Sequence, residues 1–483
     1  MNYEPVIGLE IHVEMLTESK MFCSCRVVDL TSAPPNSAVC PVCAGHPGTL
    51  PVPNVKAIEY GYMVAAALSC ELATTSIFSR KNYFYPDLPK GYQITQYDHP
   101  IGQHGKITLF TSQGERHIRI RRVHLEEDTG KLTHASSGKE SHSLVDLNRA
   151  GVPLLEIVTE PDFHSAEEVR VYAEYLRALV RYLGVNSGDL EKGVMRIEPN
   201  ISVRPVGDPK LGTKVEIKNL NSFRILEKGV DFEIQRHIQL LENGQPVLQE
   251  TVGWDDTKQA TYSQRSKEDA HDYRYFPEPD LPPITVDEAW LQELSAGLPE
   301  SPWKKAERFM ATYKLQTQEA WQLVSDLASA NFFEAVLACS PFLPVRTVFS
   351  WVTGEMVALL GAQEKWFGDS PVSAQSLANL LDLVAKGDIN QNTAKSILVE
   401  MAQSGKPAEQ IVKDKNLVQV SDTVLITTFV RDAVVENPEE VASYRAGKTT
   451  VINFLFGQAM KKASGKANPQ LMRAELERQL NNG

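Results

Sequence analysis

The sequence predicts an α+β protein, with a mixed-sheet N-terminal domain followed by two all-α domains. Three observations predict this class. Residues 7–14 alternate between apolar and polar side chains, which is the period of a half-buried strand. Strand-like segments recur as far as about residue 283, separated by segments with helical spacing. Beyond Pro299 strand alternation disappears, and only capped helical patterns follow.

The elements of the first domain follow in order. The first strand has an apolar face and a polar face, the latter formed by Gly8, Glu10, His12 and Glu14. A helix is expected at 56–68, with Asn54 as its cap. Ser165 to Glu168 has the form of a capping box, so a second helix begins there and ends before Gly184. Further strands are expected at 118–125, 154–158, 196–203 and 214–218.

The remainder of the chain is predicted to be helical. Clear helices are expected at 373–386, 390–401 and 449–463, and Asn437-Pro438 is a cap followed by a first-turn proline. A Pro-rich extended segment ends at Pro283, and we place the first boundary soon after it. The predicted domains are 1–298, 299–412 and 413–483.

Composition indicates a soluble globular protein, with 42% hydrophobic and 23% charged residues and no apolar run long enough to span a membrane. No secretory signal is visible, so we expect a cytoplasmic protein. The net charge of −12 argues against a globally basic nucleic-acid binder. Residues 441–483 nevertheless carry a net charge of +5, with two acids against Arg445, Lys448, Lys461, Lys462, Lys466, Arg473 and Arg478. This tail is either a phosphate-binding face for RNA or a solvated helical surface.

Carboxylates recur on the predicted strands. Glu10 and His12 share one strand face, which by itself is also typical of an ordinary solvated sheet face. Glu126, Glu127 and Asp128 are consecutive and need a cation to offset their repulsion, either a nearby arginine or a metal. Glu156 and Glu198 lie in apolar strands, where an unpaired carboxylate is costly. The proposed Mg²⁺ ligands are Glu10, His12, Glu127, Glu156 and Glu198. The spacing leaves open which of the three consecutive acids contacts the metal.

Two segments combine cations with other polar groups. Residues 80–92 contain Lys81, Tyr83, Asp87 and Lys90, a set that an aromatic loop packed on the core does not easily explain. Lys214, Glu216 and Lys218 share one face of another strand. Such groups can bind a nucleotide, an acyl group or transient charge, and the candidate nucleotide-binding residues are Lys81, Lys90, Lys214 and Lys218. No Gly-x-x-x-x-Gly-Lys-Ser/Thr loop is present, so ATP would be bound without that loop.

Four cysteines have the spacing of a closed structural zinc site: Cys23, Cys25, Cys40 and Cys43. The alternative is four free thiols. Cys70 and Cys339 stand alone and are expected to be buried hydrophobic side chains.

Long ordered motifs resemble the GatB family, the B subunits of the glutamyl-/aspartyl-tRNA amidotransferases, from end to end. They are Val6-Ile-Gly-Leu-Glu-Ile-His-Val13, Arg80-Lys-Asn-Tyr-Phe-Tyr-Pro-Asp87, His124-Leu-Glu-Glu-Asp128, Asp146-Leu-Asn-Arg-Ala-Gly-Val-Pro-Leu154, Lys218-Asn-Leu-Asn-Ser-Phe223 and Asp272-Tyr-Arg-Tyr-Phe-Pro-Glu-Pro-Asp280. The tail segments Gly457–Lys461 and Gly465–Pro469 match as well.

The resemblance implies a cradle-shaped catalytic domain, a helical domain and a tRNA-binding helical tail. It implies a heterotrimer that converts Glu-tRNA(Gln) or Asp-tRNA(Asn) to Gln-tRNA(Gln) or Asn-tRNA(Asn). An amidase (glutaminase) partner would release ammonia from glutamine into an internal channel, and a small third partner would wrap around the other two chains. The chain described here would use ATP and Mg²⁺ to phosphorylate the side-chain carboxylate. The resemblance gives catalytic roles to Glu10, His12, Glu127, Lys81, Tyr83 and Asp87.

Two features depart from the family pattern. Glu198-Pro199-Asn200 stands where many members have Asp-Ala-Asn, so Glu198 could bind in a shifted geometry or through water. Many members lack the four cysteines, so zinc cannot be essential to the reaction. Two other functions remain as alternatives, a non-catalytic tRNA-binding scaffold and a metal-dependent phosphohydrolase.

Overall fold

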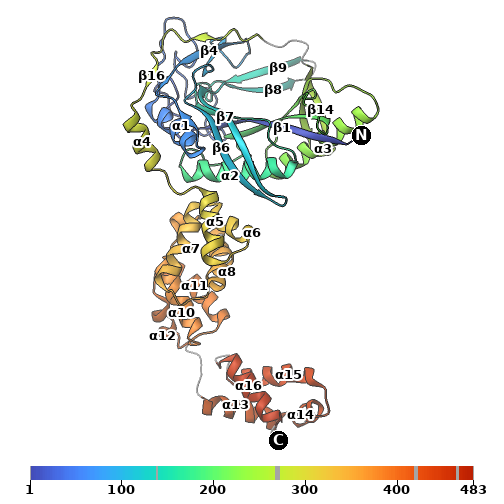
Figure 1. Cartoon of the computed structure of the whole chain (residues 1–483). Helices are drawn as coiled ribbons and strands as arrows, with labels where there is room; N and C mark the ends of the chain where they lie inside the picture. The colour runs from blue at the N-terminus through green and yellow to red at the C-terminus, as the bar shows by residue number, and fades with distance from the viewer. Residues whose placement is uncertain (1, 138–139, 267–271, 418–422, 464–466, 482–483) are drawn as a thin grey trace. The chain divides into compact units, whose positions relative to one another are not determined.

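A computed structural model describes the chain except residues 1, 138–139, 267–271, 418–422, 464–466 and 482–483 (Figure 1). Contacts between residues divide it into two compact units, Met1–Thr312 and Tyr313–Gly483. Among the described residues, no helix combines the length and apolar character that a membrane span requires.

The first unit is built on one nine-stranded sheet, in the order β14-β13-β12-β11-β1-β10-β7-β6-β2. Its strands are β1 (Tyr3–Glu14), β2 (Glu71–Leu72), β6 (Gly102–Thr111), β7 (Gly114–Glu127), β10 (Pro153–Thr159), β11 (Met195–Pro205), β12 (Val215–Lys218), β13 (Glu250–Asp255) and β14 (Ala260–Ser266). The β12–β13 pair is parallel and the other neighbours are antiparallel, so the predicted mixed sheet is confirmed.

β1 lies near the centre of the sheet, between β10 and β11. Its apolar residues are buried and its polar ones only partly so, as the alternation predicts. Three helices pack on one face of the sheet: α1 (Val55–Ala67), α2 (Ala166–Tyr182) and α3 (Phe223–Glu242) (Figure 1). The side chains of Asn54, Ser165 and Ser222 accept hydrogen bonds from first-turn N–H groups and fix where these helices begin. The opposite face of the sheet is left for polar residues.

Short strands and two helices complete the unit. β15 (Phe276–Pro277), β4 (Phe78–Asn82) and β5 (Tyr92–Gln96) form one small sheet, β16 (Ile284–Thr285) pairs with β3 (Thr75–Ser76), and β8 (Lys131–Ser137) pairs with β9 (Glu140–Asp146). α4 (Glu288–Ala296) and α5 (Pro302–Tyr313) follow. The contact division falls at the end of α5, past the predicted boundary at 298, which remains a prediction.

The described part of the second unit contains helices and no strands. They are α6 (Thr317–Val324), α7 (Leu327–Cys339), α8 (Val345–Ser350), a π-helical turn (Trp351–Met356), α9 (Val357–Gly361), a 3-10 turn (Phe367–Asp369), α10 (Ala374–Ala385), α11 (Gln391–Ser404), α12 (Ala408–Asp414), α13 (Thr423–Glu436), α14 (Pro438–Arg445), a second 3-10 turn (Thr449–Val451), α15 (Ile452–Lys462) and α16 (Pro469–Asn481). Ser373 and Asn390 cap α10 and α11, the helices expected at 373–386 and 390–401. Asn437 precedes α14, but its amide donates to the Ala433 carbonyl instead of capping the helix.

Helices α13 to α16 share a hydrophobic core of their own, centred on fully buried residues such as Val430, Leu455 and Leu476. The predicted boundary at 412/413 falls inside α12 and stays a prediction. Lys466 of the basic tail lies outside the described residues.

Candidate active site

The register of the central strands places polar residues in adjacent rows on one face. His12 on β1 lies opposite Glu156 on β10, which lies opposite His124 on β7. Directly opposed residues in a sheet point to the same side, so all three share the face that the helices leave free. The next rows add Glu10 beside one end of this line and Glu126 beside the other.

A β-bulge in β7 makes this convergence possible. Val158 pairs with Arg122, but the next residue, Thr159, pairs with Ile120, so Arg121 is an extra residue in β7. Before the bulge even-numbered residues such as Ile120 are buried in the apolar layer; after it odd-numbered residues such as Val123 are. The shift turns the even-numbered His124 and Glu126 onto the polar face.

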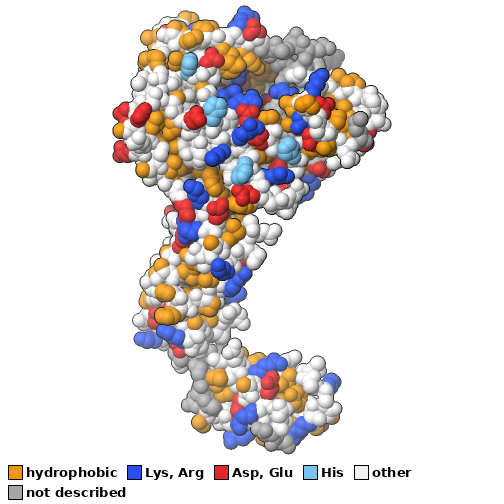
Figure 2. Space-filling model, viewed as in Figure 1, with side chains coloured by type: hydrophobic (Ala, Val, Ile, Leu, Met, Phe, Trp, Pro, Cys, Tyr) orange, Lys and Arg blue, Asp and Glu red, His pale blue; other side chains and the backbone are white. Residues whose placement is uncertain are grey.

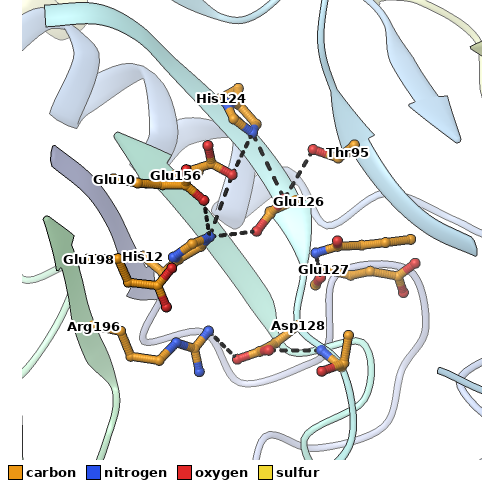
Figure 3. A network of polar contacts seen from close by, with 12 residues as sticks. Glu10, His12, Thr95, His124, Glu126, Glu127, Asp128, Glu156, Arg196 and Glu198 are labelled. Atoms are coloured by element: carbon orange, nitrogen blue, oxygen red, sulfur yellow. Dashed lines mark hydrogen bonds and ion pairs between the residues drawn. The ribbon is translucent and has the colours of Figure 1, made fainter. Parts of the chain in front are cut away.

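The side chains meet around the His12 ring (Figure 3). Its Nε2 lies 3.5 Å from Glu126 Oε1, 3.5 Å from Glu156 Oε2 and 3.8 Å from Glu10 Oε1. His124 Nε2 lies 3.3 Å from Glu156 Oε2 and 3.9 Å from Glu126 Oε2. Two overlapping groups, each with three possible ligand atoms within 4.8 Å of one another, share Glu156: one adds Glu10 and His12, the other His124 and Glu126.

The electrostatics of this group fit a bound cation. His12 Nδ1 is buried without a hydrogen-bond partner. Burial alone would lower the pKa of His12, but the hydrogen bond and charge of Glu156 outweigh it and raise the pKa to about 9. Burial and the Glu156 charge raise the pKa of Glu10 to about 6. Several carboxylate oxygens around one point are the ligand type that Mg²⁺ prefers, so these residues fit the metal expected from the sequence.

Lys81 on β4 faces the same carboxylates. Burial opposes its charge, but Glu126 and Glu156 raise the pKa of Lys81 well above its usual range. It forms no ion pair within 4.0 Å in the described part of the chain, and its ammonium lies 5.2 Å from the Tyr273 ring centroid and 5.9 Å from that of Tyr83. The predicted Lys81 and Tyr83 therefore border the carboxylate group.

Glu127 lies apart from the other predicted ligands. Because strand residues alternate, Glu126 and Glu127 point to opposite sides of β7. Glu127 forms an ion pair with Lys90 and accepts a hydrogen bond from the Ile94 N–H at 3.0 Å. Both ion-pair partners line a separate cavity of about 260 Å³, together with Cys23 and Cys43. The position next to His12 that the sequence assigned to Glu127 is occupied by Glu126.

Other predicted residues are placed around the site rather than in it. Glu198 lies opposite Glu10 in the register, but its carboxylate is bound to the Lys218 ammonium at 2.7 Å. Asp87 is buried near Thr129, whose hydroxyl lies 3.4 Å from it, and burial raises the pKa of Asp87. Lys214 is exposed and precedes β12.

Asp128 belongs to a neighbouring ion-pair network. Arg196 contacts Asp128 at 2.8 Å and Glu14 at 3.5 Å, and Arg149 approaches Asp128 at 3.7 Å. Burial opposes ionisation of Asp128, but Arg196 and Arg149 lower its pKa to about 2. Asp128 is therefore neutralised by arginine, which is the alternative that the sequence left open for the three consecutive acids.

The four predicted cysteines come together. Their sulfur atoms all lie within 4.8 Å of one another. Sulfurs bound to one zinc at about 2.3 Å would be about 3.8 Å apart in a tetrahedral site, so the cluster is close to that size. Hydrogen bonding from Cys23, aided by the Lys20 ammonium 3.5 Å away, lowers the pKa of the Cys43 thiol to about 4. A thiolate is the form that binds metal. Cys70 is half-buried, and Cys339 is exposed rather than buried as expected.

Sequence reasoning did not select His124, Arg122 or Glu126 as site residues, and it considered Arg122 only among the nearby arginines that could offset the three consecutive acids. Strict alternation from Ile118 and Ile120 would have sent all three into the apolar layer. The one available signal was the doubled arginine at 121 and 122, which interrupts that alternation. A bulge is the usual structural reason for such an interruption.

Comparisons with known proteins agree with this architecture. Residues 5–292 match the model of the GatB/GatE catalytic domain, and residues 331–480 match that of the GatB domain. The B subunit of the aspartyl/glutamyl-tRNA(Asn/Gln) amidotransferase of Thermodesulfovibrio yellowstonii is 47% identical over 472 residues, which cover 98% of each chain. The corresponding proteins of Persephonella marina and Moorella thermoacetica are each 46% identical, and the aligned regions cover 99% of this chain and 99% and 100% of theirs.

Proposed function

The chain belongs to the GatB family, and from this premise we propose that it activates the side-chain carboxylate of a misacylated tRNA for amidation. The substrates would be Glu-tRNA(Gln), Asp-tRNA(Asn) or both, as the names of its relatives indicate. The observation that carries the proposal is the convergence of Glu10, His12, Glu126 and Glu156 from three strands of the sheet, with Lys81 beside them.

The reaction needs a leaving group on an unreactive carboxylate. A carboxylate oxygen attacks the γ-phosphorus of ATP, the bond from that phosphorus to the β,γ-bridging oxygen breaks, and ADP leaves with the electron pair. Ammonia then attacks the carbonyl carbon of the acyl phosphate, phosphate leaves, and the nitrogen loses one proton. The substrate carboxylate and the triphosphate of ATP are both anionic and repel each other in the first step, so cationic groups must offset this repulsion.

Glu10, His12, Glu126 and Glu156 would hold Mg²⁺, whose charge stabilises the phosphoryl oxygens during transfer. Lys81, which is partly buried, supplies a second positive charge next to these carboxylates. Lys218 is already bound to Glu198, so its expected role with ATP would require that pair to open. Lys90 is likewise bound to Glu127.

Cys23, Cys25, Cys40 and Cys43 would hold a zinc ion that fixes the N-terminal loop. Four protein ligands leave zinc no open position for catalysis. Metal analysis of the purified chain tests this site, and less than about half an equivalent of zinc would contradict it.

The ammonia would come from an amidase (glutaminase) partner, and a small third chain would complete a heterotrimer in the cytoplasm. This chain has no amidase motif of its own. The basic surface of α13 to α16 would bind the tRNA body through its phosphates.

Reconstitution tests the proposal directly. The chain, with its partner subunits, is expected to form ADP and amidated aminoacyl-tRNA when given misacylated tRNA, ATP and either glutamine or ammonium chloride. Glu126→Ala should abolish both products, since it removes a metal ligand. Full activity of Glu126→Ala would favour a scaffold, and ATP or RNA cleavage without any amide product would favour a phosphohydrolase.

A further inference from the structure

Three arginines in four residues of β7 have different surroundings. Arg119 forms a bidentate pair with Asp162, at 2.9 and 2.6 Å, and Arg121 forms one with Glu160, at 3.0 and 2.8 Å. Both side chains are more than half exposed. Their charges are thus neutralised by ion pairs at the exposed surface, where such pairs contribute little to stability.

Arg122 faces the carboxylate group instead, because the bulge at Arg121 reverses the alternation of β7. Its Nη2 lies 3.4 Å from Glu156 Oε1, and its Nε lies 3.3 Å from His124 Nδ1. Its side chain keeps 25% of its surface exposed. A guanidinium has five N–H donors, so two long contacts leave most of them available to a ligand.

The register also keeps Arg122 apart from Glu10. Glu10, Val158 and Arg122 form one row across β1, β10 and β7. The ends of this row are about 10 Å apart, twice the spacing of neighbouring strands, and the residue between them is short and apolar. Glu10 and Arg122 form no ion pair across this gap in the described structure. An anionic group above Val158 would lie between the Arg122 guanidinium and the carboxylates that would hold a metal ion.

Other cations near the site are already bound to carboxylates. Arg196 is bound to Asp128 and Lys218 to Glu198, at 2.8 and 2.7 Å. Lys81 and Arg122 face the carboxylate group and, within the described residues, lack an ion pair shorter than 3 Å. A transferring phosphoryl group carries negative charge on three oxygens and needs more than one positive partner.

We propose that Arg122 is a catalytic residue that binds the γ-phosphoryl group of ATP during its transfer to the side-chain carboxylate. This inference rests on the proposed function above. Arg122 gives and takes no proton; its N–H groups donate to phosphoryl oxygens while the bond to ADP breaks and the bond to the carboxylate forms. Planar paired donors suit phosphate better than the point charge of lysine.

The test uses the full chain with its partner subunits, misacylated tRNA, ATP and ammonium chloride. Initial rates of ADP formation are measured while ATP and tRNA are varied separately. Arg122→Ala should lower kcat about 100- to 1,000-fold, the usual range when a transition-state donor is lost. Arg122→Lys should recover part of the rate, and added guanidinium chloride should partly rescue Arg122→Ala. Arg119 lies in the same strand but is paired with Asp162 at the exposed surface, so the kcat of Arg119→Ala should stay within about threefold of that of the unaltered chain.

A second measurement separates catalysis from support of Glu156. The Mn²⁺ affinity of Arg122→Ala, measured by electron paramagnetic resonance, should stay within about threefold of that of the unaltered chain. Three outcomes would overturn the proposal: a kcat that hardly changes, a loss of Mn²⁺ binding in parallel with activity and without guanidinium rescue, or an effect confined to KM for aminoacyl-tRNA. The last would mean that Arg122 binds the substrate carboxylate instead. If the unaltered chain forms neither ADP nor amide, the proposed function itself fails, whatever Arg122 does.

Discussion

Glu126 and Glu127 are chemically identical neighbours at the end of β7, yet they belong to different parts of the protein. Glu126 contacts His12 and accepts from the Thr95 hydroxyl at 3.1 Å. Glu127 pairs with Lys90 beside the cysteine cluster. Residue type alone could not separate them, since either one offers the same carboxylate. Only the direction of each side chain decides which can join a metal site.

The pair provides a matched test at the scale of one residue. Glu126→Gln should weaken Mn²⁺ binding more than about tenfold, because loss of a ligand costs at least as much as loss of its supporting contacts. Glu127→Gln has the same chemistry and should change Mn²⁺ affinity less than about threefold. Titration monitored by electron paramagnetic resonance measures both. A larger loss in Glu127→Gln than in Glu126→Gln would contradict the assignment.

At the scale of elements, the sequence pattern predicted those strands and helix starts that depend only on nearby residues. The alternation of β1, the cap Asn54 and the helix starts at Ser165, Ser373 and Asn390 agree with the predictions, since these signals depend on neighbours within a few residues. The bulge at Arg121 was not predicted. It depends on pairing with β10, more than thirty residues later, which no local pattern encodes.

The same limit explains which site residues were found. Glu10 and His12 were selected because they share one polar strand face, and Glu156 because a carboxylate in an apolar strand is costly without a partner; the structure brings the three together. Glu198 also lies in an apolar strand, but Lys218 on the adjacent strand supplies its partner. The partner of a buried acid is set by strand order, so the sequence could indicate that a partner exists without identifying it.

Helix α3 carries a buried contact with a predictable pH response. Glu233 is fully buried and contacts Arg236, His237 and the Thr261 hydroxyl of β14. Burial would raise its pKa, but His237, Arg236 and Thr261 lower it to about 2. A lowered pKa stabilises the fold above the unfolded value near 4.5, and this contribution is lost as pH falls toward 2.

Glu233→Gln should therefore lower the unfolding free energy at pH 7 by up to about 3 kcal/mol. The difference from the unaltered chain should be smaller at pH 4 than at pH 7. Thermal unfolding at the two pH values measures it, and Glu242→Gln, an exposed change on the same helix, is the control. An equal difference at both pH values would show that the Glu233 charge does not stabilise the fold.

At the scale of the whole molecule, charge is distributed unevenly. The chain is acidic overall, yet its last four helices carry basic groups on their surface (Figure 2). Some of these cations are paired, as Lys462 is with Glu436 at 2.6 Å. Lys448 and Lys461 are exposed and form no ion pair within the described residues. Unpaired surface cations are the ones available to phosphates.

The double variant Lys448→Gln/Lys461→Gln should weaken tRNA binding. It should also reduce the slope of log K against log salt by about 1 for each lysine that contacts a phosphate. Lys462→Gln is the matched control, since its charge is already neutralised, and it should change the slope much less. Binding is measured by filter retention at several salt concentrations. An unchanged slope in the double variant would place the tRNA elsewhere.

The position of β1 has a consequence for how this protein is made. β1 leaves the ribosome well before its partner strands, because Glu10 pairs with Val158 and Glu198, which are translated far later. At about 5–20 residues per second, roughly 10–40 seconds pass before both partner strands exist. During that time the apolar residues of β1 have no sheet to cover them, and an unpaired apolar strand readily joins the wrong partner. We expect nascent chains shorter than about 205 residues to engage chaperones and to bind no divalent cation, because the strands that assemble the site are not yet all present.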